Sequence, residues 1–109
     1  MRLVRGRLCA RDVALHKQLL DLAGDGAELC DHREAPWASI TFEGSRHKLR
    51  VLFSGDQAEA ASARFIAALR EHEFAIPGHV IAEATTGEAE WYSGVDAIVP
   101  VELLLLKEA

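Results

Sequence analysis

The stretch that decides the fold is WASITFEGSRHKLRVLFS, residues 37–54. Apolar and polar side chains alternate in its first seven and in its last nine residues, which is typical of two β-strands covered on one face. Gly44 and Ser45 lie between them, and a two-residue turn with glycine first suits a hairpin. With that turn, Ile40 faces Leu49 and the polar side chains share the opposite face, whereas a shift by one residue mixes the faces. The sequence therefore predicts a hairpin that turns at Gly44-Ser45.

One helix is predicted before the hairpin. Leucines recur at helical spacing over residues 12–23, and Gly24 then supplies the residue that most easily takes the left-handed conformation at a helix end. A short strand is predicted further upstream, over residues 2–9. A brief strand over 27–31 separates the helix from a polar loop and the hairpin.

A second helix is predicted after the hairpin. Asp56 followed by Glu59 resembles a capping box, in which two side chains satisfy free backbone amides at the helix start. An apolar stripe then recurs at helical spacing as far as His72. A strand over residues 79–86 follows the second helix.

The last predicted strand, residues 97–107, carries apolar side chains on both faces, so a cover on both faces is expected. Because Pro100 cannot donate a hydrogen bond to a neighbour, this strand is predicted to lie at a sheet edge or to be bulged there. The elements together predict one α+β domain, residues 1–109, with two helices on a mainly antiparallel sheet of about five strands. Their order matches the split βαβ arrangement of ferredoxin-like domains with an extra C-terminal strand.

Composition narrows the class of protein. Half of the 109 residues are apolar, which is enough for one hydrophobic core. Twelve basic and 17 acidic side chains give a net charge of −5, so we expect no nucleic acid partner. No apolar run is long enough for a bilayer span or a signal peptide, so we expect a cytoplasmic protein and no membrane partner. The lack of asparagine and the preference for arginine over lysine indicate a GC-rich bacterial genome.

Cysteines and histidines show no metal-binding motif. Cys9 and Cys30 form no CxxC pair, so we expect reduced, buried thiols instead of a disulfide framework or a zinc finger. The five histidines lack the HxH, HxxxH and HExxH spacings. His72 and His79 bracket the connection from the second helix to the next strand and are the best metal candidates, although a histidine at a helix end is also favourable for its charge alone. We therefore expect no metal and no cofactor.

Acid or base chemistry has four candidates. His32 lies in the segment 31–34, which is predicted to be a polar loop with four titratable groups. His32, or else His47 or His79, would act with a nearby carboxylate such as Glu83 in a pocket at a sheet end or dimer interface. No partner nucleophile and no phosphate-binding or dinucleotide motif supports this chemistry. A small enzyme or a ligand-binding sensor is therefore the second functional hypothesis.

The sheet face that the helices leave open is the predicted interface. Large apolar side chains on that face need a cover, either from the rest of the chain or from a second subunit. Symmetric dimers are the commonest oligomers. The leading hypothesis is a small non-catalytic binding or assembly domain that forms a homodimer through its sheet and accommodates an unidentified small molecule or protein. The predicted interface residues are Trp37, Leu52, Ile98, Leu104 and Leu106.

Overall fold

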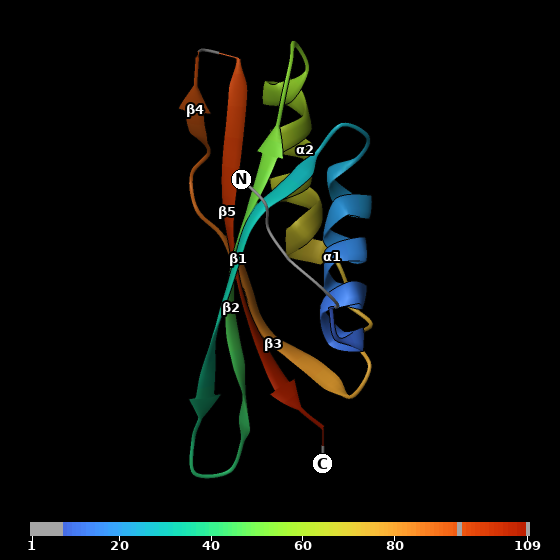
Figure 1. The fold of residues 1–109 in the computed structure, drawn as a ribbon, viewed down its shortest axis with the longest axis vertical. Helices are drawn as coiled ribbons and strands as arrows, with labels where there is room; N and C mark the ends of the chain where they lie inside the picture. The colour runs from blue at the N-terminus through green and yellow to red at the C-terminus, as the bar shows by residue number, and fades with distance from the viewer. Residues whose placement is uncertain (1–7, 94, 109) are drawn as a thin grey trace.

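A computed structural model describes residues 8–93 and 95–108. Two helices lie side by side on one face of a five-stranded antiparallel sheet (Figure 1). The strands are ordered β1-β2-β5-β3, and β4 pairs with β5 on the same side as β3. In chain order the elements are α1 (Ala10–Ala23), β1 (Glu28–Ala38), β2 (Glu43–Phe53), α2 (Ala58–Glu71), β3 (His79–Thr86), β4 (Glu90–Tyr92) and β5 (Asp96–Lys107).

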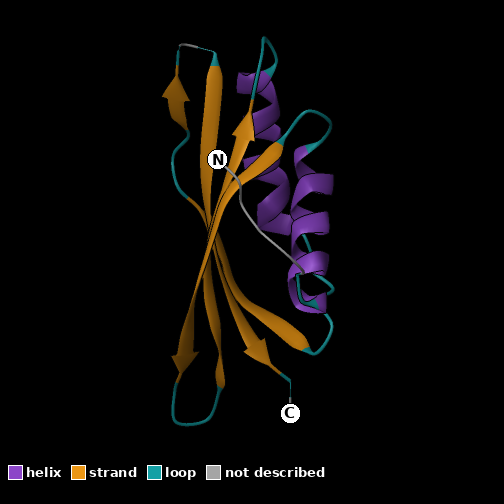
Figure 2. Ribbon diagram, viewed as in Figure 1, coloured by secondary structure: helices purple, strands orange, loops and turns teal. Residues whose placement is uncertain are grey.

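The predicted class, two helices on an antiparallel sheet of about five strands, is confirmed. Both helices cover the same face of the sheet, and the other face carries no described helix (Figure 2). The predicted strand over residues 2–9 falls almost entirely outside the described residues, and the two of its residues that are described, Leu8 and Cys9, are not in a strand. The ferredoxin-like order depends on that strand and stays a prediction.

The hydrophobic core lies between the helices and the odd-numbered side chains of β2 and β5. Buried side chains alternate with more accessible ones along most of both strands, as the two-residue repeat of a strand requires. Leu15 and Leu19 from α1 and Phe65 from α2 are fully buried against them. α1 begins at Ala10, two residues earlier than predicted, and its buried stripe also contains His16. A titratable side chain therefore lies at the edge of the core.

The hairpin is present, but its predicted turn is wrong. β1 and β2 pair on either side of a turn that begins at Ser39, whose N–H donates to the carbonyl of Phe42 at 2.7 Å. Ile40 is fully exposed in this turn and does not face Leu49. Because the turn comes earlier in the chain, the residues that pair with β2 also lie earlier. The segment 31–34, predicted as a loop, therefore belongs to β1.

Gly44 lies within β2, and the close approach of β5 explains why a glycine stands there. A Cβ atom at this position would lie 1.9 Å from the backbone oxygen of Leu105. On the other side of β2, Gly44 pairs with Trp37 of β1. The prediction failed because this glycine serves a close contact between strands, which the sequence pattern does not distinguish from a turn.

β5 is a central strand, and its pairing with β2 runs through Pro100 without a bulge, so the prediction of an edge position or a bulge there is wrong. It pairs with β2 on one side and with β3 and β4 on the other. Pro100 lies where β3 has ended and β4 has not begun, beside the connection 87–89. Gly87 N–H donates to the Pro100 carbonyl at 3.0 Å. The nitrogen and the carbonyl of one residue face the same side of an antiparallel strand, so the nitrogen of Pro100 also faces this gap, where no neighbouring strand needs a donor.

Neither helix has a side-chain cap. Gln57 precedes α2 and makes no capping hydrogen bond, so the capping box predicted for Asp56 and Glu59 is wrong. Cys9 precedes α1 and is exposed, so the prediction of a buried thiol is wrong there, whereas Cys30 is half-buried. Neither described helix is long and apolar enough to cross a membrane.

Candidate metal centre

Three histidines from three different elements meet between α1 and the sheet. His32 pairs with Leu49, and Glu34 pairs with His47, across the β1–β2 ladder. Directly opposed residues share a face of a sheet, so both strand imidazoles lie on the face that the helices cover. His16 reaches them from the buried stripe of α1. The turn at 39–42 sets this register and so creates the cluster.

The three imidazoles form a hydrogen-bonded row. Nε2 of His16 lies 2.7 Å from Nδ1 of His32, and Nε2 of His32 lies 2.8 Å from Nδ1 of His47. The row ends at Ser45, whose Oγ lies 2.7 Å from Nε2 of His47. In each ring contact one nitrogen donates and the other accepts, because a neutral imidazole has one N–H and one lone pair.

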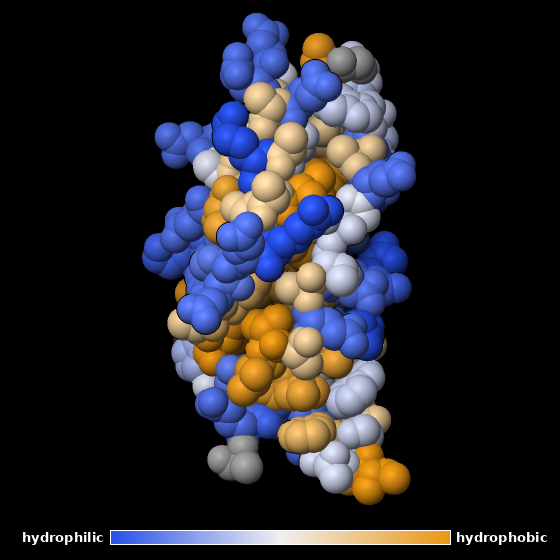
Figure 3. Space-filling model, turned by 180° about the vertical axis from the view of Figure 1, so that it is seen from behind, coloured by the Kyte–Doolittle hydropathy of each residue, from blue (hydrophilic) through white to orange (hydrophobic). Residues whose placement is uncertain are grey.

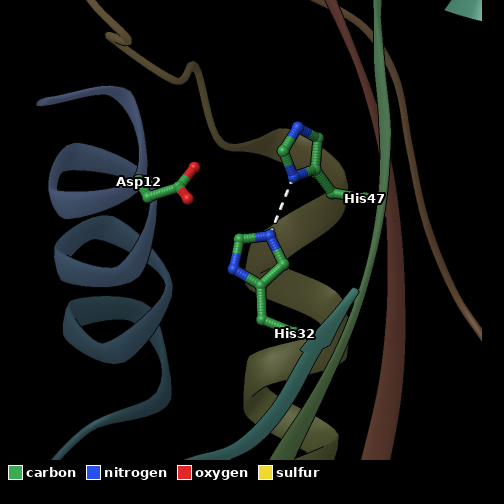
Figure 4. Close-up of side chains that lie close together, drawn as sticks. All are labelled: Asp12, His32 and His47. Atoms are coloured by element: carbon green, nitrogen blue, oxygen red, sulfur yellow. Dashed lines mark hydrogen bonds between the residues drawn. The ribbon is translucent and has the colours of Figure 1, made fainter. Parts of the chain in front are cut away.

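Asp12 completes the cluster. It precedes His16 by one helical turn, and its carboxylate points toward the two strand histidines (Figure 4). One ligand atom each from Asp12, His32 and His47 lie within 4.8 Å of one another. Within residues 8–93 and 95–108, no other group of three or more histidine, cysteine or acidic side chains converges in this way.

Arg11 sets the charge of the carboxylate. Its Nε lies 2.9 Å from Oδ1 of Asp12, and its Nη2 lies 2.7 Å from Oε1 of Glu34. Burial alone would raise the pKa of Asp12, but the hydrogen bond and positive charge of Arg11 hold that pKa below its ordinary value. Asp12 is therefore an anion at neutral pH, as a metal ligand must be.

Burial keeps the three imidazoles neutral. Burial, together with the charges of Arg11 and His32, lowers the pKa of His47 to about 4. Burial also lowers the pKa of His16 and that of His32, where it outweighs the opposing effect of Asp12. Each ring therefore keeps a lone pair at pH 7, which is the protonation state that a metal ion requires.

The spacing of the donor atoms suits a small cation. Zinc binds imidazole nitrogen at about 2.0–2.1 Å, and two such nitrogens in a tetrahedral site lie roughly 3.3 Å apart. The facing nitrogens of His32 and His47 lie 2.8 Å apart, so the two rings would move apart by about 0.5 Å to admit the ion. Two imidazoles and one carboxylate are typical of zinc sites that keep a fourth position open, whereas magnesium and calcium prefer oxygen ligands.

The other predicted site residues do not join this cluster. His72 and His79 line one hollow beside α2, but His72 contacts the side-chain oxygen of Gln18 at 3.2 Å and His79 contacts a backbone carbonyl at 2.8 Å. Glu83 lies on the other face of the sheet, 3.3 Å from Arg46. Of the four candidate catalytic residues, the structure brings only His32 and His47 together.

The helix-free face carries ion pairs. Arg46 contacts Glu102 at 2.8 Å, and Arg50 contacts Glu90 at 2.5 Å. A hollow of about 500 Å³ on this face is lined by both basic and acidic side chains. Acidic neighbours therefore compensate much of the positive charge on which a nucleic acid would depend.

The five predicted interface residues lie on this same face. Leu104 is only 3 % exposed, and the other four are half-buried. Much of the expected need for a cover is therefore met within one chain. The others are Leu52 of β2, Ile98 and Leu106 of β5, and Trp37, which pairs with Gly44 of β2.

Comparison with known proteins does not supply a function. No protein-family model matches the chain, and no curated protein or solved structure matches it at a significant level. The class of the protein is therefore defined by its own fold and site. It is a small α+β domain with a histidine and carboxylate cluster between a helix and a sheet.

Proposed function

We propose that this chain is a small binding domain that holds one divalent transition-metal ion between α1 and the sheet. Asp12, His32 and His47 are the ligands. The observation that carries the proposal is the convergence of their three ligand atoms within 4.8 Å. The proposal departs from the sequence-based expectation of no metal, and it develops the hypothesis of a ligand-binding sensor with a histidine and carboxylate site.

The chemistry of the donors points to zinc or a similar borderline ion. Imidazole nitrogen suits zinc, nickel, cobalt and copper, and a single carboxylate is too few oxygen ligands for calcium. The cation would also compensate the charge of a largely buried Asp12, whose side chain is 15 % exposed.

The surroundings favour binding over catalysis. His47 is fully buried and His16 is 8 % exposed, so the protein closes the site on the core side. The Glu34 side chain is 41 % exposed and marks the side from which an ion can enter. These closed surroundings therefore favour a bound cation over a bound substrate.

Zinc titration of the full chain tests the proposal. After treatment with a chelator, the protein should bind one Zn²⁺ per chain, as measured by calorimetry and by native mass spectrometry. His32→Ala and His47→Ala should each remove most of the binding, whereas His79→Ala should leave it unchanged because His79 lies outside the cluster. Absence of stoichiometric zinc, or equal binding by His32→Ala and the parent chain, would refute the proposal.

A homodimer through the helix-free face is the second candidate. Phe42 and Val80 are 56 % and 50 % exposed, and with Leu106 they line a shallow hollow at one end of the sheet. Seen from behind, apolar side chains gather in the lower half of the molecule (Figure 3). A second copy would cover such a patch symmetrically, because the same surface serves both subunits of a dimer.

Sedimentation velocity tests the homodimer. Leu106→Asp and Val80→Asp should each give a monomer, because a carboxylate cannot be buried there without a partner. Val13→Asp is the matched control, since Val13 is equally exposed but lies on α1. Dimers that persist in both sheet variants, or a parent chain that is monomeric at high concentration, would exclude this interface.

A further inference from the structure

We propose that His16 and Ser45 are positioning residues that select which ring nitrogens of His32 and His47 hold the metal ion. The inference rests on the proposed metal site and goes beyond it, because it assigns the ligand atoms and two residues that touch no metal. His32 would bind through Nε2, and His47 would bind through Nδ1.

Each strand histidine has one ring nitrogen engaged by a neighbour. Nδ1 of His32 lies 2.7 Å from Nε2 of His16, and Nε2 of His47 lies 2.7 Å from Oγ of Ser45. The remaining nitrogens of the two rings face each other at 2.8 Å, with the carboxylate of Asp12 beside them (Figure 4). The nitrogens without an outer partner are therefore the two that converge.

This arrangement follows a general feature of metal sites. A histidine that binds a metal almost always donates its other ring N–H to a neighbouring acceptor, which fixes the tautomer and the orientation of the ring. Nε2 of His16 and Oγ of Ser45 are such acceptors. Both side chains are nearly fully buried, at 8 % and 5 % exposure, so water does not readily replace them.

The protons of the three imidazoles balance when the ion enters. In the bound state His32 carries its proton on Nδ1 and donates to His16, whose own proton is then on Nδ1. His47 carries its proton on Nε2 and donates to Ser45. The hydrogen bond between His32 and His47 breaks, and two metal–nitrogen bonds form from neutral rings without net release of a proton.

Backbone geometry holds the two positioning residues in place. His16 lies one helical turn after Asp12, so α1 supplies both a ligand and a positioning residue. Ser45 lies two residues before His47 on the same face of β2, and Arg11 Nη1 donates to its hydroxyl at 3.4 Å. The second lone pair of that oxygen is left for the N–H of His47.

Nitrogen NMR of ¹⁵N-histidine-labelled protein reads the ligand atoms directly. On saturation with Zn²⁺, the metal-bound nitrogen should be Nε2 in His32 and Nδ1 in His47. His16 should keep both ring nitrogens free of metal. A spectrum in which His16 binds the ion, or in which His32 binds through Nδ1, would overturn the assignment.

Affinity measurements test the role of the two neighbours. His16→Ala and Ser45→Ala should each weaken Zn²⁺ binding about 10- to 100-fold, as loss of such outer partners usually does. His16→Gln and Ser45→Thr keep an acceptor oxygen and should restore most of the affinity. The Co²⁺ absorption spectrum should keep its shape in all four variants, because no ligand is lost.

Three further outcomes distinguish failure of this inference from failure of the proposed function. If the parent chain binds no Zn²⁺ or Co²⁺, the metal site itself is refuted. If it binds but the two alanine variants retain full affinity, the metal site stands and the positioning role is refuted. A Co²⁺ spectrum altered in His16→Ala as in His32→Ala would make His16 a ligand and would likewise overturn the inference.

Discussion

Nε2 of His32 and Nδ1 of His47 face each other at 2.8 Å across two neighbouring strands. The two residues do not pair directly in the ladder, since His47 pairs with Glu34. They meet because their side chains lean toward each other on the helix-covered face. Asp12 approaches this pair from α1, so the only proposed ligand outside the sheet comes from a helix.

A bound metal ion should therefore link α1 to the sheet. A ligand present at 100 times its dissociation constant stabilises a fold by about 2.7 kcal/mol, which corresponds to a rise of roughly 10 °C in Tm for a domain of this size. Zinc should produce such a shift and should slow amide hydrogen exchange in α1 in particular. Asp12→Asn should lose most of both effects.

Asp21→Asn is the control for this experiment. Asp21 lies on the same helix, but its exposed carboxylate pairs with Lys17 at 2.9 Å away from the cluster. Its removal should leave the zinc response intact. A zinc response that is the same in the Asp12 and Asp21 variants would contradict the bridging role of Asp12.

The stability of the metal-free chain should fall in mild acid. The pKa of His47 is about 4 in the folded chain and about 6.5 in an unfolded one. Above pH 6.5 both states are neutral at this residue, so its contribution is fully present. As the pH falls from 6.5 to 4, the unfolded chain takes up a proton that the folded chain does not, so the free energy of unfolding decreases by up to about 3 kcal/mol.

Urea unfolding in the presence of a chelator, between pH 7.5 and 4.5, measures the slope of the free energy of unfolding against pH. His47→Gln should reduce it, because the imidazole whose pKa differs most between the folded and unfolded chain is then absent. The range ends above the pH at which Asp12, whose pKa is lowered, takes up its proton. Equal slopes in the parent chain and in His47→Gln would contradict the buried neutral imidazole.

Much of the fold could be predicted because it depends on local periodicity. The helical spacing of leucines locates α1, and the apolar stretch near the C-terminus locates β5, each to within two residues. The turn between β1 and β2 could not be located in the same way. Gly44 is compatible both with a turn and with a close strand contact, and only the position of Leu105 in the folded sheet decides between them.

The cluster could be predicted only in part, because its register depends on that turn. His32 and His47 are candidates from the sequence, but a polar loop and a strand give no reason to bring them together. Asp12 and His16 were missed, although their four-residue spacing places both on one face of a helix. The signal available in the sequence was this pair of titratable residues, four positions apart, beside the leucine stripe of the helix.

Gly44→Ala should destabilise the fold strongly. The added Cβ would lie 1.9 Å from the carbonyl oxygen of Leu105, which belongs to the backbone of a central strand and cannot move alone. We expect a loss of about 3 kcal/mol or more in the free energy of unfolding, at the upper end of overpacking effects. Thr41→Ala, in the exposed turn, should change it by less than about 0.5 kcal/mol. Urea titration of both variants gives the comparison. If Gly44→Ala leaves the free energy of unfolding unchanged, β2 and β5 do not approach so closely.

Arg46→Ala should uncover Leu104. Arg46 of β2 and Glu83 of β3 are the two ladder partners of Leu104, which lies on the strand between them. Their side chains meet at 3.3 Å across that strand, and Leu104 is only 3 % exposed although no described helix covers this face. The apolar stem of the arginine and the ion pair together are thus the cover, because a long charged side chain can shield apolar surface while its head stays in water.

The binding of a dye that fluoresces on apolar surfaces measures the uncovering of Leu104. Arg46→Ala should increase the fluorescence several-fold and should promote self-association. Glu83→Gln should change it little, because Glu102 still contacts Arg46 at 2.8 Å and holds the stem in place. Arg33→Ala is the surface control, since the side chain of Arg33 is 79 % exposed. If Arg46→Ala binds no more dye than Arg33→Ala does, then Leu104 is shielded by something other than the arginine, and a second subunit becomes the leading explanation.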